Sequence, residues 1–420
     1  MVSNNRVSVL LSTYNRADFI GVALDSILGQ SKPPDQVVVI NDGSTDRTVE
    51  VIEKYLDQVT YLEQENGGKA SALNNAMPLI DGDFLWIFDD DDIAFPYALE
   101  ILSRALSENA DAAFAYGGYI AVKDKGYGAL EKLKEVPPLE LTDDEFLSRL
   151  MYGDFLGTPG MLFRTSAMRS VGLFDTALMR CQDYDMKLRL ARRYRVVRVD
   201  SYLFKRRYHD QGLRGGKNSP FSMRDFGAVA LQYEGILFEK VRDNFGLIDF
   251  LPGRPVNREG HSTVTGIRRR EALFQRMRVM AVHGLWEYAV DDLSAAIDNL
   301  LESGAPPLSS AEKWCCHDAM SDVFSTTNLL EKNRHTVHRI RLLCRQEGAA
   351  AVILELSKGL AYVRPRLCRS SPDPGSKMAR YFRRIACNLR IYWAIVRWLG
   401  IKGLLQGARA KFIPPTRGLG

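Results

Sequence analysis

The sequence predicts an α/β fold, in which a doubly wound, mostly parallel sheet is followed by an α-helical C-terminal region. Two observations predict this arrangement. In the first ninety residues, short apolar runs alternate with helical segments, as is typical of buried parallel strands joined by right-handed crossovers. Beyond about residue 226, helical patterns dominate and are separated by breaks that contain Pro and Gly.

Seven elements are predicted in the first part of the chain. Each predicted strand is a run of four to six residues rich in apolar and β-branched side chains, and each predicted helix repeats its apolar residues at helical spacing. In order, they are strand Val7–Ser12, helix Phe19–Leu28, strand Gln36–Ile40, helix Thr48–Leu56, strand Val59–Leu62, helix Ala70–Met77 and strand Phe84–Phe88. The later helical stretches are Glu271–Tyr288, Val290–Leu301, Ala311–Leu329, Thr336–Cys344 and Ala349–Tyr362.

A chain of 420 residues suits two or three domains. We expect a catalytic α/β domain over residues 1–225, an α-helical domain over residues 226–360, and a basic tail over residues 361–420. The helical domain carries no motif to which chemistry can be assigned.

The tail differs sharply in charge from the rest of the chain. It holds thirteen Lys and Arg against one acid, Asp373, so its charge is +12, and the first 360 residues then carry 5 − 12 = −7. Apolar residues at alternating spacings of four and three between Ile385 and Leu399 predict an amphipathic helix. Such a helix binds an anionic membrane surface or packs on the helical domain, and both readings stay open. Nucleic acid is not an expected partner, because no recognised binding module accompanies the charge.

The termini and the cysteines indicate a cytoplasmic protein. Met1–Arg6 leads straight into a strand pattern without the features of a signal peptide, and the apolar run Ile391–Val396 is too short to span a bilayer. Six cysteines lack paired CxxC spacing, so reduced thiols are expected and a zinc site is not. If the tail binds lipid, the protein would sit peripherally on the inner membrane face.

Polar segments follow each of the four predicted strands. Open parallel sheets bind ligands at the carboxyl ends of their strands. Taken singly, each segment also fits a turn or a helix cap, with Ser44 or Thr45 capping the second helix. Four such segments at one edge favour a binding site instead. The segments are Thr13–Arg16, Asn41–Ser44, Glu65–Lys69 and Asp89–Asp92.

The four adjacent aspartates Asp89–Asp92 are the sharpest feature. Their carboxylates repel one another at the end of an apolar strand, and burial increases the cost. A solvated acidic turn is the structural alternative. A divalent cation such as Mn²⁺ or Mg²⁺ would relieve the repulsion, because both ions accept oxygen ligands from carboxylates and substrate phosphates. The ion would then act as a Lewis acid on a diphosphate leaving group.

This ordered set of strings closely resembles the family-2 glycosyltransferases, which have the GT-A fold. The resemblance rests on the Ser12–Arg16 string, the Asn41–Asp46 string, Asn66-Gly67-Gly68 with Asn74, and Asp89-x-Asp91-Asp92, and it covers roughly residues 6–210. It implies transfer of a sugar from a nucleotide-diphosphate donor, with UDP favoured.

The resemblance also implies roles for individual donor-site residues. Thr13 and Asp42 would contact the nucleotide base, with Asn15 and Arg16 close by. Asp89 would face the ribose, and Asp91 would ligate the metal that bridges the donor phosphates. Lys69 is expected to contact a phosphate as a compact point charge, although a surface lysine would look the same in the sequence.

A second signature covers Gly172–Asp175 and Cys181–Leu190. In enzymes of this type, the aspartate at the position of Asp183 is the general base, which removes the proton from the attacking hydroxyl. Asp183/Lys187 and Asp185/Arg189 are both i,i+4 pairs, so a salt-bridged helix start is the alternative. Gln182 departs from the family, which often has an acid there, and this weakens inference about acceptor contacts.

His209 lies where the resemblance places a further metal ligand or phosphate contact. A lone histidine more often has neither role. Together these expectations describe an inverting glycosyltransferase for a hydroxyl of a glycan or a lipid-linked glycan, within polysaccharide biosynthesis.

Three other functions compete with this one. Transfer to a polyprenyl phosphate needs no base, so Asp183 argues against it. A non-catalytic nucleotide-sugar-binding scaffold would not be expected to retain both Asp91 and Asp183. Sugar-nucleotide synthesis calls for a glycine-rich loop after the first strand, where this chain has Ser12–Arg16.

Overall fold

The computed structural model describes residues 5–126, 128–209, 226–253, 264–302, 305–321 and 334–343, and a few positions between 349 and 356. The chain divides into two compact units, Met1–Ser262 and Thr263–Gly420. The predicted boundary after residue 225 precedes α8 (Phe226–Asn244), which belongs to the first unit. The predicted basic tail, residues 361–420, lies outside the described residues.

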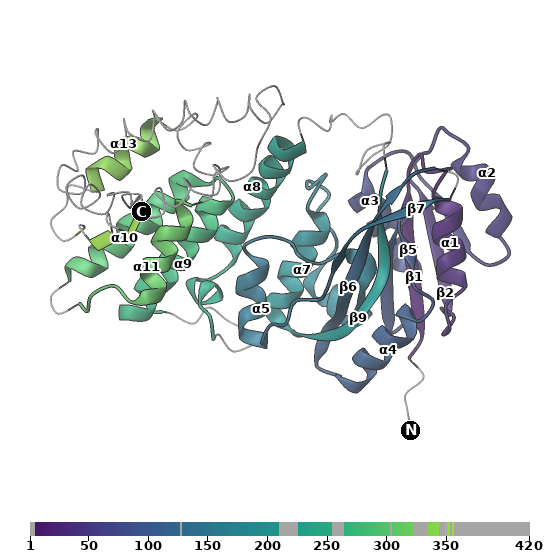
Figure 1. The fold of residues 1–420 in the computed structure, drawn as a ribbon, viewed down its shortest axis with the longest axis horizontal. Helices are drawn as coiled ribbons and strands as arrows, with labels where there is room; N and C mark the ends of the chain where they lie inside the picture. Colours follow the sequence, from purple (N-terminus) through teal and green to yellow (C-terminus); the bar gives the residue numbers. More distant parts are fainter. Residues whose placement is uncertain are drawn as a thin grey trace, which may run out of the picture. The chain divides into compact units, whose positions relative to one another are not determined.

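One nine-stranded sheet forms the centre of the first unit (Figure 1). Its strand order is β3-β2-β1-β4-β8-β6-β9-β5, and β7 pairs with β6. The strands are β1 Val7–Thr13, β2 Gln36–Asn41, β3 Thr60–Glu63, β4 Phe84–Asp89, β5 Ile93–Ala94, β6 Ala112–Asp124, β7 Leu130–Val136, β8 Met161–Arg164 and β9 Arg195–Tyr208.

The first four strands of the chain pair in parallel, as predicted. Val9 on β1 is opposite Val37 on β2 and Trp86 on β4, and all three side chains are buried. Each of the four predicted strands coincides with an observed strand to within one residue at either end. Near-continuous apolar runs form these strands because both faces of a parallel sheet are covered.

The rest of the sheet is mixed. β8 runs antiparallel to both β4 and β6, while β9 runs parallel to β6. No strand was predicted beyond Phe88, so this half of the sheet is an addition to the predicted topology. The α/β fold class with a helical C-terminal region is confirmed.

Helices cover both faces of the sheet. Helices α1 and α4 share one apolar cluster with alternate residues of the parallel strands, including Val9, Trp86 and Phe88. Helix α3 contacts β1 and β2 outside that cluster and therefore covers the opposite face. The helices of this unit are α1 Ile20–Leu28, α2 Thr48–Ile52, α3 Lys69–Ala76, α4 Ala98–Glu108, α5 Asp143–Leu150, α6 Thr165–Val171, α7 Gln182–Arg193 and α8. Among the described residues of this unit, four 3-10 helices accompany them: η1 Glu53–Tyr55, η2 Met77–Leu79, η3 Thr158–Gly160 and η4 Leu247–Phe250.

The second unit is helical where it is described, in α9 Gly266–Val282, α10 Trp286–Leu301, α11 Ser310–Ala319 and α13 Arg334–Leu343. The single helix predicted over Glu271–Tyr288 is wrong, because Gly284 has a φ of +77° and ends the first helix in a turn. A buried Arg270–Glu312 ion pair joins α9 to α11 at 2.7 Å. Across the described part of the chain, no helix is both long and apolar enough to cross a membrane.

Candidate active site

The strand register brings all four predicted tips to one edge of the sheet, since Asn41 at the end of β2 is also opposite Glu63 at the end of β3. Thr13 at the end of β1 is opposite Asn41 at the end of β2, and Ser12 is opposite Asp89 at the end of β4. Thr13 is almost fully buried there. The polar segments that follow these strands therefore lie side by side, as predicted from the parallel pairing.

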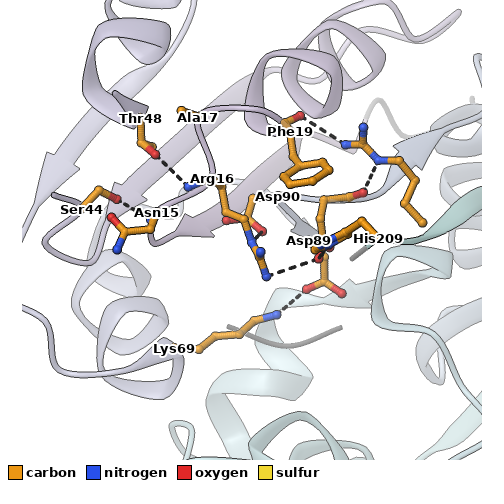
Figure 2. A network of polar contacts seen from close by, with 12 residues as sticks. Asn15, Arg16, Ala17, Phe19, Ser44, Thr48, Lys69, Asp89, Asp90 and His209 are labelled. Carbon is orange, nitrogen blue, oxygen red and sulfur yellow. Dashed lines mark hydrogen bonds and ion pairs between the residues drawn. The ribbon is translucent and has the colours of Figure 1, made fainter. Parts of the chain in front are cut away.

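Asn15 ties the segment after β1 to the segment after β2. Its φ of 53° is in the left-handed region, which asparagine tolerates better than most residues. Asn15 Oδ1 accepts a hydrogen bond from the Thr45 backbone N–H at 2.7 Å. Ser44 Oγ accepts one from the Asn15 N–H at 2.9 Å (Figure 2). Ser44 and Thr45 thus join the two loops and do not cap α2, which has Arg47 at its N-cap position.

Asp42 organises the loop after β3. Its Oδ1 accepts from the Gly67 N–H at 2.8 Å and from Gln64 Nε2 at 2.7 Å, and its Oδ2 accepts from the Gly68 N–H at 2.9 Å. Gly68 has a φ of +86° and directly precedes α3. The carboxylate of Asp42 therefore holds the loop that presents Lys69.

The acidic run meets cations supplied by the chain itself. The buried Arg16 guanidinium lies 3.5 Å from Asp90 Oδ1 and 3.5 Å from Asp91 Oδ2. Lys69 points at Asp89 and bonds its carboxylate (Figure 2). Asp92 instead accepts the backbone N–H of Arg207 at 2.9 Å. Part of the repulsion that the sequence attributes to this run is therefore relieved by Arg16 and Lys69.

Three neighbouring aspartates have different ionisation. Burial raises the pKa of Asp90 to about 6, although Arg16 opposes it. Burial also raises the pKa of Asp92 well above its usual value, and the charges of Asp91 and Asp89 add to the effect. Burial acts in the same direction on Asp91, but the His209 hydrogen bond and Arg16 outweigh it and lower that pKa. Asp91 is thus the most readily ionised of these three.

His209, immediately after β9, completes a pair with Asp91. Its Nε2 lies 3.2 Å from Asp91 Oδ2, and its ring lies against Phe19 with the centroids 4.3 Å apart. The other ring nitrogen, Nδ1, is buried and has no hydrogen-bond partner among the described residues. The tertiary fold therefore brings together two residues that are 118 positions apart in the sequence.

These two side chains fit a shared divalent ion. Asp91 Oδ2 and His209 Nε2 lie 3.2 Å apart, close enough for both to ligate one ion. Carboxylate oxygen and imidazole nitrogen both suit Mn²⁺. Among the described residues, no group of three or more His, Cys, Asp or Glu could hold a metal by itself. Substrate oxygens would have to supply the remaining ligands.

Asp183 lies in the first turn of α7, and its side chain is 35% exposed. Its Oδ2 accepts hydrogen bonds from Thr158 Oγ1 at 3.0 Å and from Lys187 Nζ at 3.0 Å. Burial opposes its ionisation, but Lys187 and Lys69 outweigh burial and hold the pKa of Asp183 far below its usual value. The i,i+4 salt bridge that the sequence offered as an alternative to a catalytic role is therefore present.

Lys69 connects the two halves of the site. Burial alone would lower its pKa, but the carboxylates of Asp89, Asp183 and Asp90 outweigh burial and raise it. One ammonium is therefore under the influence of both the acidic run and Asp183. This places the predicted donor-site residues and the predicted base in the same region.

Sequence reasoning missed several residues of this site. Asp154 and Thr158 lie between α5 and β8, Asp154 in irregular chain and Thr158 in the short η3, and neither gives a periodic signal. Arg207 lies next to the predicted His209 motif, yet its contacts with Asp91 O and with Phe19 O at 3.2 Å depend on the position of β9. Gln182, which replaces the acid often found in the family, is buried, and its Oε1 has no partner among the described residues.

Over its N-terminal half, the chain is similar to proteins that are named glycosyltransferases. An uncharacterized glycosyltransferase of Rickettsia felis is 32% identical over 213 residues, which cover 49% of this chain and 34% of that protein. One from Rickettsia typhi is 30% identical over 210 residues, which cover 49% of this chain and 64% of that protein. The chain therefore spans about one third to two thirds of the length of these relatives.

Solved structures resemble the chain more distantly. The structure of S. aureus TarS 1-349 in complex with UDP-GlcNAc has a TM-score of 0.47 at 18% identity and covers 85% of this chain and 91% of its own. A mannosyltransferase from Pyrobaculum calidifontis in complex with GDP-Man and Mn²⁺ has a TM-score of 0.42 at 17% identity. The match covers 84% of this chain and 87% of the mannosyltransferase chain.

The family described as Glycosyl transferase family 2 matches residues 8–169. This range contains the four strand tips, Asn15 and Arg16, the Asp42 loop, Lys69 and the acidic run. Residues 8–169 therefore belong to glycosyl transferase family 2, and this part of the chain is a glycosyltransferase domain.

Proposed function

We propose that the chain is an inverting, metal-dependent glycosyltransferase, which transfers a sugar from a UDP-sugar to a hydroxyl of a glycan or a lipid-linked glycan. The position of Lys69 carries the proposal. Its ammonium contacts Asp89 and also interacts with Asp183, so one cation links the proposed donor site to the proposed base. Known neighbours crystallised with UDP-GlcNAc, or with GDP-Man and Mn²⁺, provide the precedent for the donor and the metal.

The donor would bind along the strand tips. Thr13 and Asp42 would face the base, and Asn15 would keep the two loops around it in place. Asp42 already accepts three hydrogen bonds from the Gln64–Gly68 segment, which leaves its carboxylate about one further lone-pair site for a ligand. Asp89 would bind the ribose. Lys69 and Arg16, which now neutralise aspartates, would become available to the anionic diphosphate.

Asp91 and His209 would hold Mn²⁺ or Mg²⁺ together with the donor phosphates. The ion, when bound, would neutralise charge that develops on the leaving diphosphate. Since the pKa of Asp91 is lowered, its carboxylate is ionised and ready to bind a cation at neutral pH. The Arg16 guanidinium lies 3.5 Å from the same carboxylate. Arg16 and a bound ion would therefore compete for Asp91.

Asp183 would accept the proton of the attacking hydroxyl. Its lowered pKa guarantees the ionised form but makes it a weak base while Lys69 and Lys187 act on it. A bound diphosphate would attract Lys69 and so weaken the effect of this cation on the pKa of Asp183. The pKa of Asp183 would then rise toward a value better suited to proton transfer, and only when a donor is bound.

The proposal is tested by incubating the full chain with a panel of nucleotide-sugars, with and without Mn²⁺ or Mg²⁺, and by measuring release of the nucleoside diphosphate. We expect one donor to be consumed with either metal and to be spared when EDTA is present. Metal-independent transfer, or transfer only to a polyprenyl phosphate, would contradict the proposal. Donor binding without turnover under any acceptor tested would favour the scaffold alternative.

A further inference from the structure

The buried ammonium of Lys187 binds the Asp183 carboxylate. The Lys187 side chain is only 1% exposed, and its Nζ has three partners: Asp154 Oδ2 at 2.8 Å, Asp183 Oδ2 at 3.0 Å and the Leu156 carbonyl at 3.1 Å. A lysine has three donor hydrogens, so all of them are used. This lysine has no further donor to offer a ligand, and it acts on the site only through the groups that it already binds.

Asp154 keeps the ammonium in this position. Its Oδ2 binds Lys187, while its Oδ1 accepts the Leu156 backbone N–H at 3.0 Å. Both oxygens of Asp154 are therefore anchored, one by the cation and one by the backbone. A fully buried lysine is stable only when it is paired and hydrogen-bonded, and Asp154 supplies most of that pairing.

The two hydrogen bonds to Asp183 both reach the same oxygen. Thr158 from η3 and Lys187 from α7 donate to Oδ2, and none of the described residues donates to Oδ1. Turning the plane of the carboxylate away from Thr158 and Lys187 would break both bonds, whereas a half-turn only exchanges two equivalent oxygens. The carboxylate is therefore held in one orientation with Oδ1 left free.

We propose that Lys187, held by Asp154, is a positioning residue that orients the Asp183 carboxylate so that Oδ1 receives the proton of the acceptor hydroxyl. This inference rests on the proposed role of Asp183 as the base. It distinguishes Lys187 from Arg189, whose i,i+4 partner is Asp185 and whose other bonds reach the Val171, Gly172 and Leu173 carbonyls.

Three charged groups face Asp183 and determine its ionisation: Lys187 from α7 itself, Lys69 from α3, and Asp154 from the segment before η3. Removing the charge of Lys187 leaves burial and the negative Asp154, which disfavour ionisation, opposed by Lys69. The pKa of Asp183 must then rise. A carboxylate loses its basic form as the pH falls through its pKa, so the loss of transfer at low pH moves to a higher pH in the variant.

The experiment compares the wild-type full chain with Lys187→Met and with the double variant Asp154→Asn, Lys187→Met. Methionine preserves most of the side-chain length without the charge, and the double variant avoids leaving Asp154 unpaired if the single variant fails to fold. Asp185→Asn is the matched control, because it breaks the neighbouring i,i+4 pair on the same helix. The readouts are UDP affinity, kcat and KM for the acceptor, the pH profile of kcat/KM, and the ¹³C titration of the Asp183 carboxylate, assigned with Asp183→Asn.

We expect kcat to fall about 10–100-fold in both Lys187 variants, as for a misplaced catalytic group, with UDP affinity unchanged. In Lys187→Met the acid limb of kcat/KM and the Asp183 titration should move to higher pH, and in the double variant, which also loses the negative charge of Asp154, they should move less. Asp185→Asn should leave all of these unchanged. An unchanged pH profile and titration would overturn the proposal, even if thermal stability fell. If the wild type transfers no sugar, the proposed function fails, while the ¹³C titration still tests whether Lys187 controls Asp183.

Discussion

At the residue scale, four adjacent aspartates acquire different chemistry from their neighbours. Asp91 is kept ionised by His209 and Arg16, whereas Asp92 is buried beside other carboxylates and its pKa is raised well above the usual value. Identical side chains thus differ because burial favours the neutral form and a nearby cation favours the charged form. Of Asp90, Asp91 and Asp92, the most readily ionised is the one that faces a histidine.

The role of Asp91 leads to the first prediction. Asp91→Asn should abolish the increase in UDP affinity that Mn²⁺ produces and preserve the fold, because a neutral amide replaces an anionic ligand of the same shape. Isothermal titration with UDP, with and without Mn²⁺, measures this effect. Asp89→Asn is the contrast: it should weaken UDP binding equally in both conditions. A full metal-dependent gain in Asp91→Asn would contradict the metal site.

Asp183 leads to the second prediction. Asp183→Asn should bind UDP like the wild type but transfer sugar about 10²–10⁴-fold more slowly, which is the usual contribution of a positioned general base. Single-turnover measurements at saturating donor separate the two effects. If UDP affinity collapses while transfer at saturation survives, Asp183 is a binding residue.

At the scale of elements, the loop between β3 and α3 depends on one backbone conformation. Gly68 combines a φ of 86° with a ψ of 161°, a region that is essentially restricted to glycine. A Cβ added at Gly68 would meet nothing within 4 Å, so a substitution there changes backbone strain and not packing. The Gly68 N–H also donates a hydrogen bond to Asp42, and Gly68 directly precedes Lys69.

The third prediction uses Gly68, because a substitution there changes backbone strain without changing packing. Gly68→Ala should lower the free energy of unfolding by about 1–3 kcal/mol and weaken UDP binding, since the loop must leave Asp42 to relax. Gly126→Ala is the matched control, because Gly126 has a φ of +83°, also has open space around it and lies at the β6–β7 turn. Chemical denaturation and UDP titration of both variants test the prediction. Equal loss of UDP affinity in both would show a general effect of stability.

At the scale of the whole molecule, the proposed chemistry lies entirely in the first unit. Every predicted site residue, from Thr13 to His209, falls within Met1–Ser262. The second unit includes the last sixty residues of the chain, which hold thirteen Lys and Arg and one acid. Clustered positive charge attracts anionic surfaces, and salt screens that attraction.

The fourth prediction concerns this charge. A chain that ends at Tyr362 should keep its UDP affinity but lose association with vesicles that contain anionic lipid. Binding by the full chain should weaken as salt rises, because the screening length is already about 10 Å at 0.1 M. Co-sedimentation with anionic and neutral vesicles at several salt concentrations measures it. Equal binding to neutral vesicles, or no binding together with lower thermal stability of the shortened chain, would contradict the electrostatic attraction.

The parallel half of the sheet and the residues at its edge could be predicted from the sequence. Apolar runs such as Val7–Ser12 can be recognised because strands buried on both faces exclude polar residues, and parallel pairing then places their carboxyl ends together. The division at Gly284 was missed, because one glycine within a helical pattern does not reveal the sign of its φ. The strands of the mixed half of the sheet were missed as well, because the sequence pattern beyond Phe88 does not divide that part of the chain into individual strands.

The sequence by itself determined the α/β class, the order of the polar loops and the identity of the ionisable residues, because these depend on local periodicity and on side-chain chemistry. Only the tertiary structure decided which of those residues act on one another. The pairing of Asp91 with His209 spans 118 residues, and Asp154 reaches Lys187 across 33. Such contacts, and the ionisation that they produce, depend on how β9, η3 and α7 pack around the sheet edge. No local sequence pattern carries that information.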